Sequence, residues 1–237
     1  METGHRTGGK GMFQIDSYIE ELLGLLKEEF GGRLIYLGLQ GSYLRNEQNG
    51  SSDIDIMAVI DEINVRDLER YRDILMRIGY YEKSCGFICG KEELSHWNPL
   101  EACHLAHTTK DIYGCLSGLI PDYTTEDIKK FVMLSVGNLY HEIGHRFIHA
   151  DRERNRAALP GSYKAVFFIL QNLTFLRTGL FYGTKKELLH ALDGRDKEVL
   201  EVLLYQQSGI VMDFDNAFAL LFSWCQKTLR ELSDETI

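Results

Sequence analysis

The sequence lacks the features that mark membrane-spanning and secreted proteins. No apolar run approaches the roughly 20 residues that a helix needs to cross a bilayer, and no charged and then apolar segment opens the chain. The five cysteines are odd in number and lie among apolar residues, which favours reduced thiols over disulfides. Cys85 and Cys89 have no second pair of matching spacing, so we expect no zinc site there. These absences predict a cytoplasmic protein with no membrane partner.

An excess of basic charge is also missing. The net charge of −9 argues against non-specific binding to nucleic acid. No internal repeat is visible, and the only low-complexity stretch is the Gly-rich, polar start, so we expect residues 1–12 to be a disordered extension. The 237 residues are enough to bury a real core, in one large domain or two small ones.

Two patterns divide the chain near Pro121. Strand and helix patterns alternate over residues 13–120, whereas residues 121–237 are almost wholly helical in pattern. The sequence therefore predicts an α+β fold, with a mixed sheet flanked by helices followed by a helical bundle.

The elements of the first half follow from apolar periodicity and from end signals. We expect a helix capped by Asp16 and ended by Gly31-Gly32, then strands at "RLIYLGLQ" and "DIDIMAVI", a helix from Asn64 to Gly79, and strands at "YYEKSCGFICG" and "EACHLAH". In the second half we expect a helix with a capping box at Thr124 or Thr125, a break at Pro160-Gly161, and helices near 184–193, 195–207 and 213–234.

Asp53 and Asp55 lie two residues apart at the start of a predicted strand. Residues with this spacing share one face of a strand, so the two carboxylates repel each other unless a cation lies between them. Mg²⁺ prefers oxygen ligands, and it combines a few carboxylates with substrate phosphates. The pair therefore predicts a metal site at the rim of the sheet.

Gly41 and Ser42 follow the preceding predicted strand and open a short segment that could be helical. A glycine lets the backbone approach a ligand closely, and a hydroxyl beside unpaired N–H groups suits a phosphate. Asn49 and Gly50 then form a turn back to the aspartates. Phosphate and metal sites at adjacent strand ends are what metal-assisted phosphoryl or nucleotidyl transfer requires, because the ions bridge substrate oxygens.

The stretch "GSYLRNEQNGSSDIDIMAVID", residues 41–61, resembles the signature of the DNA polymerase β-like nucleotidyltransferase superfamily, in which Gly-Ser precedes an Asp-x-Asp strand. The order of helices and strands extends the likeness over residues 12–110. The helical second half is similar in pattern to the bundle of the small-molecule branch, which includes the kanamycin (aminoglycoside) and lincosamide nucleotidyltransferases.

This resemblance implies a set of binding roles. Gly41, Ser42 and Ser52 would hold the phosphates of ATP or another nucleoside triphosphate. Asp53 and Asp55 would bind Mg²⁺, with two ions expected.

Members of the superfamily usually carry a third carboxylate on the next strand, where this chain has Cys85 and Gly86. Glu101 is our preferred substitute as the third catalytic and metal-binding carboxylate, with Glu82 and Asp111 as further candidates. If none of them serves, the chain would be a nucleotide-binding homologue with impaired catalysis.

The resemblance also suggests two residues in the helical half. Lys164, which we expect at a helix start, would reach the triphosphate; its alternative is a surface lysine with a packed apolar stem. Glu142 is a candidate general base for the hydroxyl of the acceptor.

The segment "HEIGH", residues 141–145, matches the His-Glu-x-x-His motif of zinc proteases. The third ligand is the weak point, because His141 and His149 would lie about 12 Å apart along a helix. That separation is too large for one ion held at about 2.1 Å. The alternatives are exposed histidines beside a packed helix face, or a helix that contacts substrate.

The sequence thus predicts a Mg²⁺-dependent nucleotidyltransferase that moves a nucleoside monophosphate, AMP from ATP, to a hydroxyl and releases pyrophosphate. The acidic composition favours a small acceptor, such as a cationic aminoglycoside, over nucleic acid. A protein-modifying or antitoxin-type nucleotidyltransferase with a protein acceptor is the alternative, and a homodimer is left open.

Overall fold

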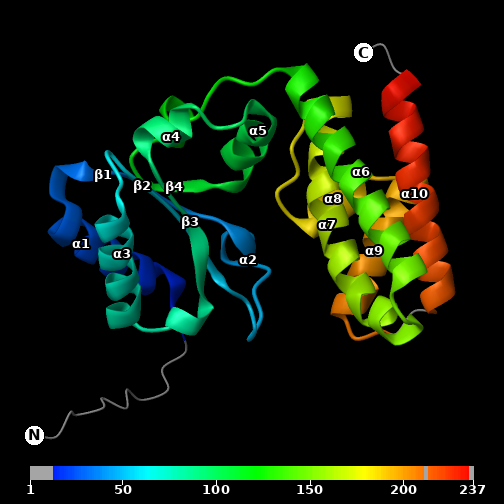
Figure 1. The fold of residues 1–237 in the computed structure, drawn as a ribbon, viewed down its shortest axis with the longest axis horizontal. Coiled ribbons are helices and arrows are strands. Elements are labelled where there is room, and N and C mark those ends of the chain that lie inside the picture. The colour runs from blue at the N-terminus through cyan, green and yellow to red at the C-terminus, as the bar shows by residue number, and fades with distance from the viewer. Residues whose placement is uncertain (1–12, 211–212, 235–237) are drawn as a thin grey trace, which may run out of the picture. The chain divides into compact units, whose positions relative to one another are not determined.

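The computed structural model of the protein describes residues 13–210 and 213–234 (Figure 1). The expected extension at residues 1–12 lies outside the described residues. The chain divides into a first unit, Met1–Leu94 with Lys110–Leu116, and a second unit, Ser95–Thr109 with Ser117–Ile237.

The elements of the first unit are mostly those expected from the sequence. They are α1 (Ile15–Phe30), a 3₁₀ turn (Gly31–Arg33), β1 (Leu34–Leu39), α2 (Gly41–Leu44), β2 (Ile54–Ile60), α3 (Val65–Ile78), a 3₁₀ turn (Tyr81–Lys83), β3 (Ser84–Gly90) and β4 (Lys110–Tyr113). The short helix α4 (Lys91–Ser95) ends one residue beyond the unit.

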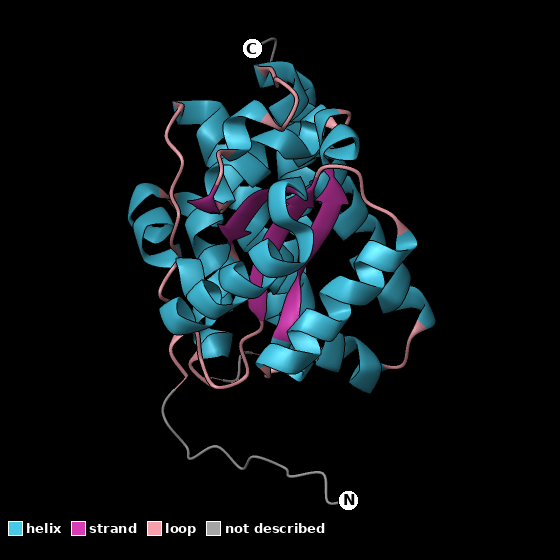
Figure 2. Ribbon diagram, turned by 90° about the vertical axis from the view of Figure 1, so that its left-hand side faces the viewer, coloured by secondary structure: helices cyan, strands magenta, loops and turns pink. Residues whose placement is uncertain are grey.

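The four strands form one mixed sheet in the order β3-β2-β1-β4, drawn in magenta in Figure 2. β1 runs antiparallel to β2 and to β4, whereas β2 and β3 are parallel and are joined through α3. Apolar side chains of α1 and α3 pack with alternate residues of β2, which include Ile54 and Ile56. Because side chains alternate across a strand, Asp55 projects from the other face.

The ends of α1 and α3 show which side chains stop each helix. Asn64 caps α3 in a capping box with Asp67, as the sequence indicates. The expected cap at Asp16 is wrong: Gln14 occupies the cap position, α1 starts at Ile15, and Asp16 lies in its first turn. A carboxylate there is still favourable, because it faces the positive end of the helix dipole.

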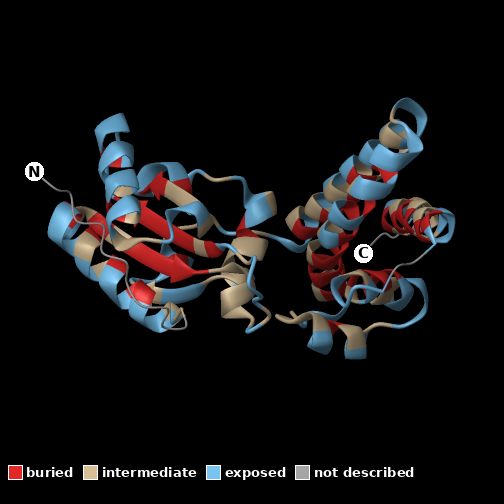
Figure 3. Ribbon diagram, turned by 90° about the horizontal axis from the view of Figure 1, so that it is seen from below, coloured by how far each residue is buried: buried red, intermediate tan, exposed pale blue. Residues whose placement is uncertain are grey.

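The second unit is helical. It consists of α5 (Pro99–Thr108), a 3₁₀ turn (Leu116–Gly118) at its boundary, α6 (Thr125–His149), α7 (Arg152–Thr178), α8 (Lys185–Ala191), α9 (Gly194–Gln207) and α10 (Phe214–Asp234). The inner faces of the long helices carry the buried residues coloured red in Figure 3. Trp224, Tyr163 and Phe167 are the largest side chains of this core. No described helix has the length and apolarity that a membrane span requires.

The segment "EACHLAH" is helical, so the strand predicted there is wrong. Asn98 caps α5 by accepting a hydrogen bond from the backbone N–H of Leu100, and Pro99 occupies the first turn, where its missing N–H costs nothing. Ala102 and Cys103 are buried, and His104 contacts Asn172 of α7. These contacts assign residues 95–109 to the second unit, so the units do not separate at a single point after residue 120.

The break predicted at Pro160-Gly161 is also wrong, because α7 continues through both residues. Pro160 lies on the exposed side of α7, where water can hydrate the carbonyl of Arg156 that loses its helical donor. On the buried side, Leu159 and Tyr163 pack into the core and keep the helix continuous. Lys164 consequently lies within α7 and not at a helix start.

Candidate nucleotide-binding site

The loop after β1 is fixed against the start of β2 by its backbone. The N–H of Gln40 donates to the carbonyl of Asp55 at 2.9 Å. Gly41 follows with a φ of +70°, and a Cβ built on it would lie 1.8 Å from Oδ2 of Asp55. The Asp55 carboxylate therefore lies directly against the bare Cα of Gly41, which explains why only glycine fits there.

The two aspartates reach the surface at this point of the sheet. Asp53 precedes β2 and is exposed, and Asp55, the second residue of β2, is partly exposed. Ile54 between them is buried. The structure thus places Gly41 against Asp55, with Ser42 directly after Gly41 in the chain and Asp53 two residues before Asp55, while the binding roles of all four remain predictions.

Cys85 is a neighbour of this site that the sequence prediction did not include. The parallel register of β2 and β3 places it opposite Asp55. Partial desolvation of Cys85, an exposed residue, raises the pKa of its thiol, and the charge of Asp55 and a hydrogen bond to it raise the pKa further. The thiol is therefore protonated at neutral pH and donates to Asp55. The signal for it in the sequence was its position, where the family resemblance implies a third carboxylate.

The turn ahead of Asp53 is held by its own side chains. The hydroxyl of Ser52 accepts from the N–H of Asn49 at 2.9 Å. Nζ of Lys83 donates to the carbonyl of Gly50 at 2.6 Å. The Ser52 side chain therefore stabilises the turn that leads to Asp53. Its contact with the nucleotide remains a prediction.

The aspartate pair fits a Mg²⁺ ion that takes its other ligands from a nucleotide. Among the described residues, no three His, Cys, Asp or Glu side chains are grouped so that they could hold an ion. The described residues therefore place no third metal-binding side chain within reach of Asp53 and Asp55. Mg²⁺ is commonly bound in this way, by one or two carboxylates together with substrate phosphates and water.

The other predicted site residues lie on helices of the second unit. Glu101, on α5, is exposed and accepts from Nε1 of Trp97 at 2.8 Å. Glu142, on α6, pairs with Arg146 at 2.5 Å. Lys164, on α7, is exposed. Their part in the site remains a prediction.

The two further candidates for the third carboxylate lie in the first unit. Glu82 is exposed in the 3₁₀ turn before β3. Asp111, on β4, accepts from the hydroxyl of Tyr36 at 2.7 Å, which occupies one of its carboxylate oxygens.

The histidines of the "HEIGH" segment line one exposed row of α6. The ring centroids of His141 and His145 are 5.9 Å apart, and those of His145 and His149 are 4.5 Å apart. The described part of the chain places no third ligand beside any pair of them. This arrangement favours exposed histidines on a packed helix over the zinc site of a protease.

Neither protein-family models nor curated proteins match this chain. A search of solved structures finds the spectinomycin adenyltransferase AAD(9) from Enterococcus faecialis, solved with ATP and spectinomycin. The TM-score is 0.60 at 14% sequence identity, and the match covers 92% of this chain and 100% of that one.

The chain has a nucleotidyltransferase fold. The fold that the sequence resemblance implies is therefore confirmed, because the chain shares it with this adenyltransferase. At 14% identity the shared fold does not assign a role to any residue of this chain. The case for the candidate site therefore rests on the positions of Gly41, Asp53 and Asp55 described above.

Proposed function

We propose that this protein is a Mg²⁺-dependent nucleotidyltransferase that transfers AMP from ATP to a hydroxyl group of a small molecule. The observation that carries the proposal is the contact between Asp55 and Gly41, where a carboxylate lies on a backbone without a side chain. That contact combines a metal ligand with a loop able to approach phosphates. The fold shared with an adenyltransferase solved with ATP and spectinomycin supports the same reaction class.

The reaction assigns a task to each group. Asp53 and Asp55 would hold Mg²⁺, which when bound offsets the negative charge of the phosphates. Gly41 and Ser42 would position the triphosphate beside them. The acceptor oxygen bonds to the α-phosphorus, the bond from that phosphorus to the bridging oxygen breaks, and pyrophosphate leaves. A carboxylate, Glu101 or Glu142, would accept the hydroxyl proton, and Lys164 would bind the departing phosphates.

The acceptor class follows from charge. The protein carries a net charge of −9, which favours a small cationic acceptor such as an aminoglycoside over a polyanion. A protein acceptor is the second candidate, and a nucleotide-binding homologue without turnover is the third.

Pyrophosphate release from ATP, measured with Mg²⁺ and a panel of aminoglycoside and aminocyclitol acceptors, tests the proposal. We expect Asp55→Asn to lower turnover by about 10²–10³-fold, since a group that stabilises transition-state charge has effects of this size. Asp61→Asn is the matched control, because Asp61 is an exposed aspartate just beyond the other end of β2. Equal activity of the two variants would refute the metal role.

Radiolabelled ATP separates the acceptor classes. With the purified protein and the acceptor panel, label on a small molecule supports the proposal. After incubation with cell lysate, label on a protein band in place of a small molecule would establish the protein acceptor.

A further inference from the structure

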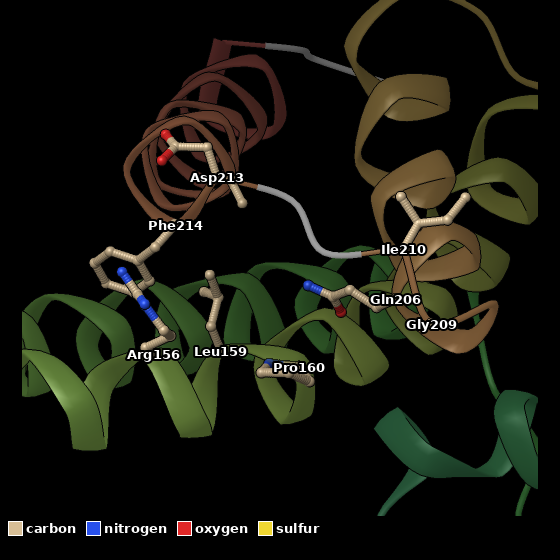
Figure 4. Close-up of a pocket in the computed structure, with 9 residues that line it drawn as sticks. Arg156, Leu159, Pro160, Gln206, Gly209, Ile210, Asp213 and Phe214 are labelled. Carbon is tan, nitrogen blue, oxygen red and sulfur yellow. The ribbon is translucent and has the colours of Figure 1, made fainter.

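A pocket of about 480 Å³ lies wholly within the second unit, between α7, the end of α9 and the start of α10 (Figure 4). Its floor is formed by Leu159, Phe214 and Ala217, all of which are buried. Pro160 and Ile210 add exposed apolar surface at the rim. A volume of this size and an apolar lining are usual for sites that bind small organic molecules.

One residue that lines the pocket, Gln206, has a side-chain oxygen without a hydrogen-bond donor among the described residues. Oε1 of Gln206 is buried, and it has no hydrogen-bond partner among the described residues. Gln206 reaches from α9 toward the wall formed by α7 (Figure 4). Because a buried acceptor without a donor is costly, this oxygen favours a ligand that brings an N–H or O–H group.

A positive charge lies at the other end of the pocket. Arg156 reaches from α7 to the ring of Phe214, with its Cζ 6.0 Å from the ring centroid. Figure 4 shows Leu159 and Pro160 between Arg156 and Gln206. No ion pair involves Arg156 in the described part of the chain, so its guanidinium can still take an anion.

The nearby carboxylate does not compensate this charge. Asp213 accepts from the N–H of Asn216 at 3.0 Å and so caps the start of α10. Its carboxylate is directed away from Leu159 (Figure 4). The guanidinium of Arg156 and the side-chain amide of Gln206 therefore lie on opposite sides of an apolar floor.

We propose that this pocket binds a small organic acid with an apolar, preferably aromatic, body and one N–H or O–H donor. The acid group pairs with Arg156, the body covers Leu159 and Phe214, and the donor reaches Oε1 of Gln206. The site does not depend on the proposed nucleotidyl transfer, and its test uses no nucleotide.

Calorimetric titration of the full chain with indole-3-acetate tests the proposal, because this probe has a carboxylate, an aromatic body and one N–H. We expect saturable binding with a Kd below about 1 mM. 1-Methylindole-3-acetate lacks the donor and should bind about tenfold more weakly, the usual effect of leaving a buried acceptor unpaired.

Variants assign the binding to the pocket. In Gln206→Leu the two probes should bind equally, whereas the control Gln207→Leu should keep the tenfold difference, because Gln207 is exposed and does not line the pocket. Ile210→Trp should abolish binding by filling the pocket from an exposed position. No saturable binding of either probe, a tenfold difference that persists in Gln206→Leu, or unchanged binding by Ile210→Trp would each overturn the proposal.

Discussion

Replacing Gly41 by alanine tests whether the close contact between Gly41 and the Asp55 carboxylate matters for nucleotide binding. Its effect must be distinguished from the backbone strain that alanine causes at any residue with positive φ. Alanine at a φ of +70° costs about 1–2 kcal/mol in any context, because its Cβ crowds the following carbonyl. At Gly41 the new Cβ would in addition meet Oδ2 of Asp55 at 1.8 Å, so the carboxylate must move. That movement costs about 1 kcal/mol through an unfavourable rotamer and about 1 kcal/mol through the lost bond from Cys85.

Gly179 supplies the matched control. It ends α7 with a φ of +71°, and a Cβ there would have nothing within 4 Å. Gly179→Ala should therefore lose about 1–2 kcal/mol of folding free energy, and Gly41→Ala about 3–4 kcal/mol. Urea unfolding measures both values.

The affinity for Mg·ATP is the decisive measurement. Displacing a residue that orients or forms a metal site lowers affinity by about 10–100-fold, so we expect that loss in Gly41→Ala and none in Gly179→Ala. When EDTA removes the Mg²⁺, Gly41→Ala should lose less affinity for ATP, because Asp55 is proposed to contact the nucleotide through the ion. If Gly41→Ala bound Mg·ATP within about twofold of the wild type, the contact with Asp55 would have no part in binding.

Two further predictions concern single contacts. Cys85→Glu should raise Mg²⁺ affinity in the presence of ATP, because it adds a carboxylate beside Asp55, whereas Cys85→Ser should leave the affinity near that of the wild type; equal affinities of both variants would contradict this. A bidentate hydrogen bond from Arg33 lowers the pKa of Asp67, so this pair stabilises the fold above about pH 4 and its contribution disappears as pH falls through the lowered pKa. The stability difference between wild type and Arg33→Met, followed by urea unfolding against pH, should shrink below about pH 4; a difference that stayed constant down to pH 2 would refute the assignment.

Local sequence rules were sufficient where one segment decides its own structure. The sequence predicted Asp53 and Asp55 at the entrance of a strand, and they lie directly before β2 and at its second residue; Asn64 with Asp67 marked the start of α3. The sequence predicted Gly41 and Asp55 at adjacent strand ends, but not their direct contact, since that contact depends on the pairing of β1 and β2. The packing that decides such contacts joins residues far apart in the chain.

Two of the wrong predictions, the break at Pro160 and the strand at "EACHLAH", have the same origin. A proline suggests a helix break, but Leu159 and Tyr163 bury one side of α7 on both sides of Pro160, and this packing outweighs the lost hydrogen bond. The short apolar alternation of "EACHLAH" fits a strand and a helix equally well. Burial of Ala102 and Cys103, with the cap at Asn98, favours the helix.

Cys85, opposite Asp55, stands where a third carboxylate could perform two tasks. Such a carboxylate can bind the ion, and it can also accept the proton of the acceptor hydroxyl. Cys85 stands opposite Asp55 and has no carboxylate oxygen with which to bind the ion or accept that proton. We infer that metal binding rests on Asp53 and Asp55 and that the general base lies elsewhere in the chain. Glu101→Gln and Glu142→Gln distinguish the candidates, because the variant that lacks the base should lose turnover while it keeps its affinity for Mg·ATP. If both kept full turnover, proton transfer would need neither residue.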